Sequence, residues 1–369
     1  MKKLYHFAIF TCIILSISVC GCGVAEQKDV AIEQSAEIWE ITDIQLQNFS
    51  SDISYVAGVT QEGVYYVQDI MEDNSLDKGV ETWHLLTFSG EDKLLYQEDI
   101  RSTEGRYHNF CLNGKNLLMS TSFGEDIKVF ELSPDAEAKE IFYHSWPMPY
   151  LQTSQSYILS IRSNPLNRDE WENELVLLDK ASGEEMIIYQ SIYNNNDATG
   201  EYIRTASVSD EKVFFTIEIT EDKQTQYWLY TYDIAEQKIV DKVSLERPIS
   251  YAVCMNDSIL LSENDSMYLE EAGRIGKNTN GVFEKTAKLP LITASNMIRD
   301  GLWVEDGVFL KSYKSGYFWK KKSNTIYVCD FTQMNDGDCV VGDYYIIEDG
   351  FVCVIQKEDG YYVRQIELK

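Results

Sequence analysis

The sequence predicts an all-β protein built from repeated four-stranded sheets, and three observations support this. Helical periodicity is almost absent after Ser35. Apolar bursts rich in Val, Ile, Tyr, Phe and Trp alternate with turn residues such as Gly, Asn, Asp and Ser. A burst preceded by a polar turn recurs about every 48 residues, with markers at Val64, Leu117, Ile158, Val213, Ile259, Val308 and Val352.

Each marker begins a strand that is followed by further strands, as in residues 174–179 and 228–233, where an Asp ends the strand and can cap the next turn. Another strand precedes each marker. Four strands per repeat of this length is typical of a β-propeller blade. We therefore predict seven four-stranded blades, with the N-terminal segment 37–43 completing the last blade and removing an exposed edge. Six blades, eight blades or a two-domain β protein remain alternatives, because residues 270–281 are polar and interrupt the fifth repeat.

This strand pattern resembles the extracytoplasmic β-propeller lipoproteins of bacteria, akin to the Tol-type propellers and the N-terminal propellers of dipeptidyl peptidases. The resemblance covers residues 36–369 and rests on strand pattern and turn chemistry. The chain lacks a Trp-Asp repeat, a kelch double Gly and a sialidase box. The resemblance implies a rigid platform outside the cytoplasm.

The N-terminus predicts export and lipidation. Lys2 and Lys3 precede an apolar run, and Val19-Cys20-Gly21-Cys22 resembles the bacterial lipoprotein signal. The resemblance implies cleavage before Cys22, with Cys20 as the alternative, and fatty acyl chains such as palmitate on Cys22 that hold the protein at a membrane. We expect residues 1–21 to be a signal peptide, residues 22–35 a flexible tether and residues 36–369 the propeller, at the outer face of the bacterial cytoplasmic membrane.

Composition excludes some functions. The formal net charge is −28, so nucleic acid would be repelled. The five cysteines of the body lack disulfide or zinc spacing and are expected to be small buried side chains; these are Cys111, Cys254, Cys329, Cys339 and Cys353.

No catalytic or metal-binding residues are predicted. His84, His108 and His144 have no local metal-ligand spacing, and no Gly-x-Ser-x-Gly is present. Residues 73–79 resemble the opening of a calcium loop, but Gly79 is one position late and His84 replaces the final Glu. We expect no cofactor, with structural calcium as the weaker alternative.

The candidate ligand-binding residues are aromatic and basic side chains near the start of the innermost strands. Arg can hold a carboxylate or phosphate, and Tyr can stack on sugars or peptides. The alternative is that the tyrosines pack between blades and the arginines are solvated. The residues are Tyr55, Arg106, Tyr107, Tyr150, Tyr202, Arg204, Tyr251, Arg299 and Tyr344.

The sequence favours a non-catalytic, monomeric binding platform for an envelope protein, peptide or cell-wall glycan. Four segments expected to be long loops would carry function, namely residues 72–80, 164–174, 194–200 and 270–281. A glycan-active hydrolase or lyase with carboxylates in the central funnel is one alternative. An accessory or sensor subunit of an envelope system is another.

Overall fold

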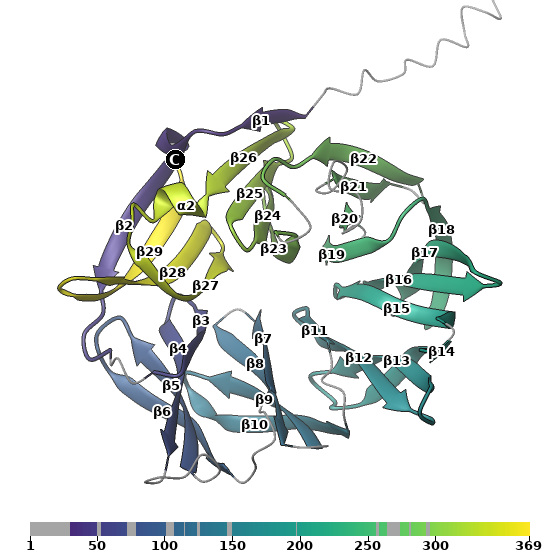
Figure 1. Cartoon of the computed structure of the whole chain (residues 1–369), viewed down its shortest axis with the longest axis horizontal. Helices are drawn as coiled ribbons and strands as arrows, with labels where there is room; N and C mark the ends of the chain where they lie inside the picture. Colours follow the sequence, from purple (N-terminus) through teal and green to yellow (C-terminus); the bar gives the residue numbers. More distant parts are fainter. Residues whose placement is uncertain are drawn as a thin grey trace, which may run out of the picture.

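The computed structural model describes residues 30–49, 53–71, 79–100, 107–113, 115–123, 126–145, 150–196, 198–255, 258–263, 274–279, 282–292 and 296–369. The predicted signal peptide, Cys20, Cys22, Arg106 and the calcium-like residues 73–78 lie outside these ranges. The described strands surround a central opening (Figure 1).

The first two sheets are antiparallel and four-stranded. One sheet contains β3 (Tyr55–Val59), β4 (Gly63–Met71), β5 (Gly79–Thr87) and β6 (Asp92–Ile100). The next contains β7 (Tyr107–Asn113), β8 (Asn116–Phe123), β9 (Asp126–Ser133) and β10 (Ala136–Ser145).

An eight-stranded sheet follows along the chain. It contains β11 (Tyr150–Thr153), β12 (Tyr157–Pro165), β13 (Glu170–Asp179), β14 (Glu185–Asn194), β15 (Thr199–Val208), β16 (Lys212–Glu221), β17 (Gln224–Asp233) and β18 (Lys238–Leu245). In the described strands, the ladder between its two halves is limited to Tyr193 and Asn194, which pair with Gly200 and Thr199.

Three more sheets complete the ring. They comprise β19 (Ile249–Met255), β20 (Ser258–Glu263), β21 (Arg274–Thr279) and β22 (Val282–Lys288); β23 (Ile298–Val304), β24 (Gly307–Ser312), β25 (Ser315–Lys320) and β26 (Thr325–Asp330) with β1 (Ala31–Glu33); and β27 (Cys339–Ile347), β28 (Gly350–Lys357) and β29 (Gly360–Leu368) with β2 (Trp39–Gln45). Two short helices, η1 (Ala36–Ile38) and α2 (Phe331–Met334), lie beside the last two sheets.

The repeat seen in the sequence corresponds to this arrangement. Each of the seven markers falls on the second strand of a four-stranded unit, and the preceding strand, from β3 to β27, lies nearest the central opening (Figure 1). The polar stretch 270–281 that interrupted the fifth repeat contains β21, which pairs with the following strand β22.

The core is divided among the interfaces between neighbouring units. Among the described residues, buried apolar side chains form seven clusters, and each cluster takes members from two adjacent four-stranded units. Trp83 and Leu85 of β5, for example, share a cluster with Met119 and Phe130 of the next sheet. Burial of apolar area therefore holds each sheet to its neighbours on both sides.

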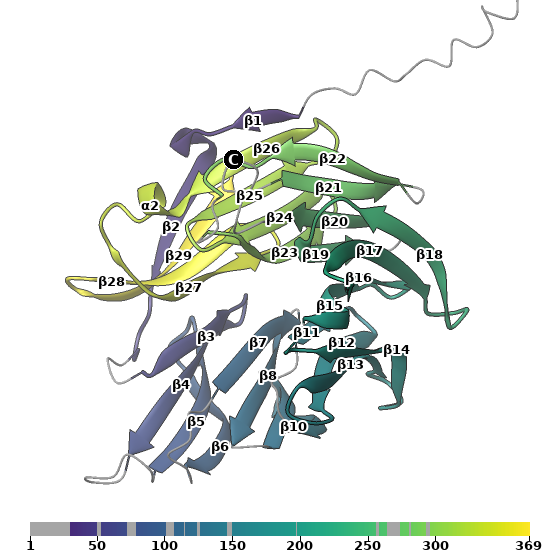
Figure 2. The same ribbon diagram turned by 45° about the vertical axis from the view of Figure 1, so that its right-hand side comes forward.

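The ends of the described chain meet in one sheet. Antiparallel pairing joins β2 to β29 from Trp39–Leu368 to Gln45–Tyr362, so β2 is the outermost strand and confirms the predicted closure. The turned view shows β1 and β2 along the outer side of the ring (Figure 2). The Trp39 indole is 3% exposed and its Nε1 donates to the Val328 carbonyl at 2.9 Å, which ties this strand to the preceding sheet as well.

A buried charge network reinforces this closure. The Arg364 guanidinium donates to both carboxylate oxygens of Asp43 at 2.8 Å, to Asp338 at 2.7 Å and to the Met334 carbonyl at 2.9 Å. Lys357 adds a 2.7 Å bond to Asp43. The hydrogen bond from Arg364, followed by that from Lys357, lowers the pKa of Asp43 against the opposing effect of burial.

Several sequence-based expectations need correction. Residues 170–174 belong to β13, residues 274–279 form β21 and Gly79 and Val80 open β5, so the expected loops are shorter. Residues 31–33, assigned to the tether, pair in parallel with β26. Cys254, Cys329 and Cys353 are buried, but Cys339 is exposed and Cys111 is half-buried.

We predict that Asp43→Asn destabilises the fold by about 3 kcal/mol, because it removes the charge that pairs with a buried guanidinium. The wild-type carboxylate has a lowered pKa, so its contribution is complete above the ordinary carboxyl pKa of about 3.9 and is lost as the pH falls through the folded-state value. Chemical unfolding monitored from neutral to acid pH measures both effects. The variant should be less stable at neutral pH and lose less stability in acid.

Glu236→Gln is the matched control. Glu236 pairs with Lys238 at 2.8 Å on an exposed hairpin, so its loss should change the unfolding free energy by less than about 0.5 kcal/mol. Equal effects of the two substitutions would contradict the role assigned to Asp43.

Candidate functional site

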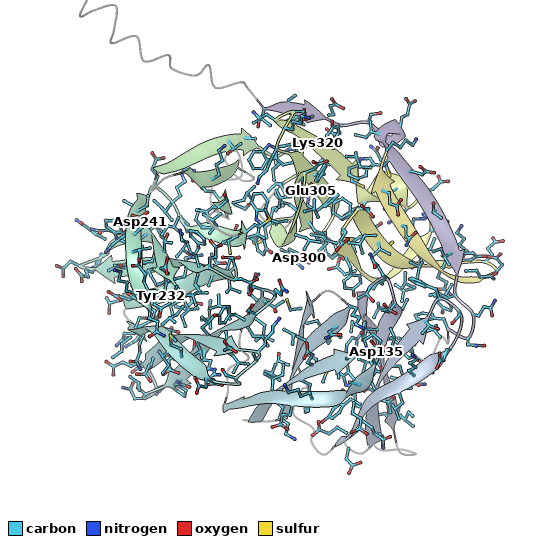
Figure 3. The ribbon with its side chains drawn as sticks, turned by 180° about the vertical axis from the view of Figure 1, so that it is seen from behind. Asp135, Tyr232, Asp241, Asp300, Glu305 and Lys320 are labelled. Atoms are coloured by element: carbon cyan, nitrogen blue, oxygen red, sulfur yellow. The ribbon has the colours of Figure 1, made fainter. Side chains whose placement is uncertain are left out.

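A cavity of about 1100 Å³ lies among the innermost strands. Its lining comes from β3, β7, β11, β19, β23 and β27, from turns that follow them, and from Lys311 of β24. Seen from behind, Asp300 lies beside the central opening (Figure 3). The charged side chains of the lining are Lys115, Arg299, Asp300, Glu305, Lys311, Asp343, Glu348 and Asp349.

Bulges shape the innermost strands. The pairing between the first and second strand of a unit shifts register at Arg204 in β15, Ser250 in β19, Arg299 in β23 and Gly342–Asp343 in β27. Arg204, Ser250 and Arg299 each lie four positions before the residue that pairs with the marker of the next strand, and Gly342 and Asp343 lie three and two positions before it. A bulge leaves its extra residue outside the ladder and re-aims its side chain, so it can bring charged residues to the cavity.

Glycine is required at one of these bulges. Gly342 has φ +88°, in the left-handed region, and a Cβ there would approach the Val56 Cβ to 3.1 Å. A side chain at this position would therefore strain the backbone and press on the neighbouring strand β3.

Lys311 organises the charged wall of the cavity. Its Nζ donates to the Asp343 carboxylate at 2.9 Å and to the Tyr344 carbonyl at 2.6 Å, and the residue is 5% exposed. In the ladder between β23 and β24, Lys311 lies directly opposite Asp300. One buried cation from β24 thus connects acidic residues on β23 and β27.

The pKa of Asp300, one carboxylate of this wall, is raised. Burial raises its pKa, Asp343 adds to that effect, and Lys311 opposes it. The Gly301 amide donates to its Oδ1 at 2.8 Å, and a hydrogen bond with the Tyr251 side chain also lowers the pKa. The net shift is upward, so the negative charge of Asp300 is only partly compensated.

Two of the nine predicted ligand-binding residues line the cavity. Arg299 is exposed and its guanidinium lies 5.6 Å from the Tyr313 ring. Tyr251 is 4% exposed and belongs to the apolar cluster between β19 and β23.

Two other predicted tyrosines pack between sheets. Tyr55 contacts the rings of Trp83 and Phe110 with centroids 6.2 and 5.7 Å apart. Tyr344 stacks on Phe331 at 3.7 Å and donates to Asn335. Their positions fit the packing role that the sequence left open for them.

The remaining predicted residues are spread over the ring. Tyr202 is 40% exposed, with its ring 5.5 Å from that of Tyr193, and Arg204 pairs with Glu218. Neither belongs to the cavity lining. Tyr107 and Tyr150 begin β7 and β11, and Arg106 is not among the described residues.

Sequence reasoning missed Asp300, Lys311 and Asp343. The sequence held one sign of them: Lys311 directly follows the apolar burst Val308 to Leu310 on the same predicted strand, next to buried positions where a charge is unusual. The partners of that charge could not be chosen among 60 acidic residues.

Two negative findings apply to the described part of the chain. It contains no group of three or more His, Cys, Asp or Glu side chains arranged to hold a metal ion. It contains no helix that is both long and apolar enough to span a membrane.

We predict that Lys311→Met destabilises the protein by about 3 kcal/mol, because the Asp343 carboxylate and the Tyr344 carbonyl lose a buried partner. The double variant Lys311→Met, Asp343→Asn should recover part of that loss, since it removes the uncompensated acid too. Urea unfolding of the wild type, Lys311→Met, Asp343→Asn and the double variant measures the coupling.

Lys238→Met, which breaks an exposed ion pair, is the control and should have little effect. Additive losses in the double variant would show that Lys311 and Asp343 are not coupled.

No protein-family model matches the sequence, and no curated protein matches it significantly. Solved structures do match. The β-propeller domain of the Trilobed protease from Pyrococcus furiosus is 12% identical, with a TM-score of 0.50, over 86% of this chain and 97% of that one. That domain is described as having an open velcro topology, whereas β2 and β29 pair in this chain.

The acylaminoacyl peptidase of Pyrococcus horikoshii is also 12% identical, with a TM-score of 0.51. The match covers 87% of this chain and 53% of the peptidase, so this chain spans about half of that protein. Likeness at this identity concerns the fold alone. The chain is an all-β β-propeller.

Proposed function

We propose that this β-propeller is a non-catalytic binding platform, held by lipid at the outer face of the bacterial cytoplasmic membrane, that binds an envelope protein, peptide or cell-wall glycan at its central cavity. The observation that carries the proposal is the cavity itself. It is about 1100 Å³ in volume and combines charged groups with the rings of Phe110, Tyr251, Trp303 and Tyr345. Ligand sites typically combine apolar and aromatic walls with a few placed polar groups.

We further infer that the ring has seven blades. The seven apolar clusters and the narrow connection between the two halves of the eight-stranded sheet both support this count. In this interpretation β11–β14 and β15–β18 are separate blades, and β2 completes the last one. A seven-bladed ring places the innermost strand of every blade around one channel.

The anchor is supported by the sequence, in which Gly21 and Cys22 follow an apolar run. Cys22→Ser should move the protein from the membrane fraction to the soluble fraction and abolish incorporation of labelled palmitate, because the thiol that would carry the lipid is gone. Cys20→Ser is the matched control and should keep both properties. A Cys22→Ser protein that still sediments with membranes and still incorporates label would contradict the anchor.

A glycan-active enzyme is the second candidate, because Asp300 and Asp343 both line the cavity beside Tyr251 and Tyr345. Glycoside hydrolysis uses two carboxyl groups, one of them protonated, on either side of the scissile bond. Burial raises the pKa of Asp300, which suits the protonated partner. Soluble sugar released from wall fragments by the wild-type protein, and not by Asp300→Asn, would favour this candidate.

Binding to purified wall fragments tests the platform. We expect the wild-type chain to sediment with the fragments without degrading them, and we expect Arg299→Ala to reduce the bound fraction several-fold, since Arg299 is the predicted arginine that lines the cavity. Combining it with Arg106→Ala and Arg204→Ala tests the three predicted arginines together. Unchanged binding by the triple variant would exclude them as the binding group.

A further inference from the structure

We propose that Arg299 and Asp300 together bind a short peptide that carries a carboxylate and a primary amine, the carboxylate at Arg299 and the amine at Asp300. This inference rests on the proposed function of the cavity as a binding site and specifies its ligand. Two adjacent residues of opposite charge both line the cavity, and the first step is to explain why they do.

Adjacent side chains of a regular strand point to opposite faces. In β23 the register shifts between Ile298 and Asp300, so Arg299 is the extra residue of a bulge. The bulge re-aims one of the two side chains. Arg299 and Asp300 are the first two residues of the continuous run 299–305 that lines the cavity, so a cation and an anion stand next to each other in its wall.

The Arg299 guanidinium can donate hydrogen bonds to a ligand. Within the described part of the chain it makes no ion pair, and its one recorded contact is with the ring of Tyr313. Arg204 and Arg364, by contrast, are paired with carboxylates. A planar guanidinium has five N–H donors and suits a carboxylate bidentately.

Asp300 needs a positive charge that the protein supplies only in part. Lys311 lies opposite it, but the Lys311 Nζ is hydrogen-bonded to Asp343 and to the Tyr344 carbonyl. The partners recorded for the Asp300 carboxylate are the Gly301 amide and the Tyr251 side chain. An ammonium group of a ligand would complete this site by a charge-assisted hydrogen bond.

The rest of the cavity favours a peptide over a simple ion. Its volume of about 1100 Å³ is at the upper end for small-ligand pockets, which leaves room for several residues. Glu305, Glu348 and Asp349 also line it, so a purely anionic ligand would be repelled. Aromatic rings in the lining can pack on the aliphatic parts of a peptide.

A series of related peptides tests whether Arg299 binds a carboxylate and Asp300 binds an amine. Nα-acetyl-lysyl-alanine has one amine and one carboxylate; its C-terminal amide lacks the carboxylate, and its Nε-acetyl derivative lacks the amine. Calorimetric titration of the full-length chain in detergent should show binding of the parent peptide and about tenfold weaker binding of each blocked peptide, because each block removes one charge-assisted contact.

The variants then separate the two contacts. With Arg299→Gln, the parent peptide and its amide should bind equally, while blocking the amine still weakens binding. With Asp300→Asn the pattern should be reversed. Arg168→Gln, at an exposed arginine outside the cavity lining, is the matched control and should reproduce the wild-type series. A thermal melt confirms that each variant is folded. Because Arg299 is exposed, the Arg299→Gln variant still tests the carboxylate contact even if Asp300→Asn does not fold.

Equal affinity of the three peptides for the wild-type chain would overturn the proposal. It would also be overturned if Arg299→Gln still bound the parent peptide more tightly than its C-terminal amide. Failure to bind the parent peptide would overturn it too. Wall-fragment binding that persists in that case, and that still depends on Arg299, would leave the proposed platform standing with a different class of ligand in the cavity.

Discussion

The bond between Arg364 and Asp43 closes a ring whose two ends are 321 residues apart in the sequence. Bringing such distant segments together costs about 5 kcal/mol of loop-closure entropy. The seven paired positions of β2 and β29, together with the burial of Trp39 between two sheets, offset that cost. Because each sheet packs only on its two neighbours, an open ring would expose one complete interface, and the cavity at the centre depends on every interface being closed.

Strand order and closure could be predicted because both follow from local pattern. The seven apolar bursts are buried second strands, and residues 37–43 alternate as an edge strand must. The tyrosines show the limit of what local pattern can predict. Tyr251 lines the cavity while Tyr344 stacks on Phe331, although both were expected near the start of an innermost strand; Tyr344 is in fact the sixth residue of β27. A bulge of one or two residues decides which face a side chain occupies, and no composition rule marks where the bulges fall.

The charged wall of the cavity could not be derived for a different reason. Asp300 and Lys311 meet across a ladder, and Lys311 reaches Asp343 in the next sheet. Such contacts depend on how sheets are placed relative to one another. Lys311 was visible as a charge directly after an apolar burst, yet only the fold identifies its partner. The chain tolerates this buried cation because a carboxylate and a carbonyl both accept its hydrogen bonds.

The parallel pairing of β1 with β26 fixes where the chain enters the ring, on its outer perimeter (Figure 2). If Cys22 carries fatty chains, the nine peptide steps from Cys22 to Ala31 reach at most about 30 Å. The propeller would then hang by its rim close to the lipid headgroups, which repel a chain whose formal charge is −30 once Lys2 and Lys3 have been removed with the signal peptide. Attachment through a short segment at the rim would let the propeller tilt relative to the membrane. Both openings of its central channel could then face the surrounding wall.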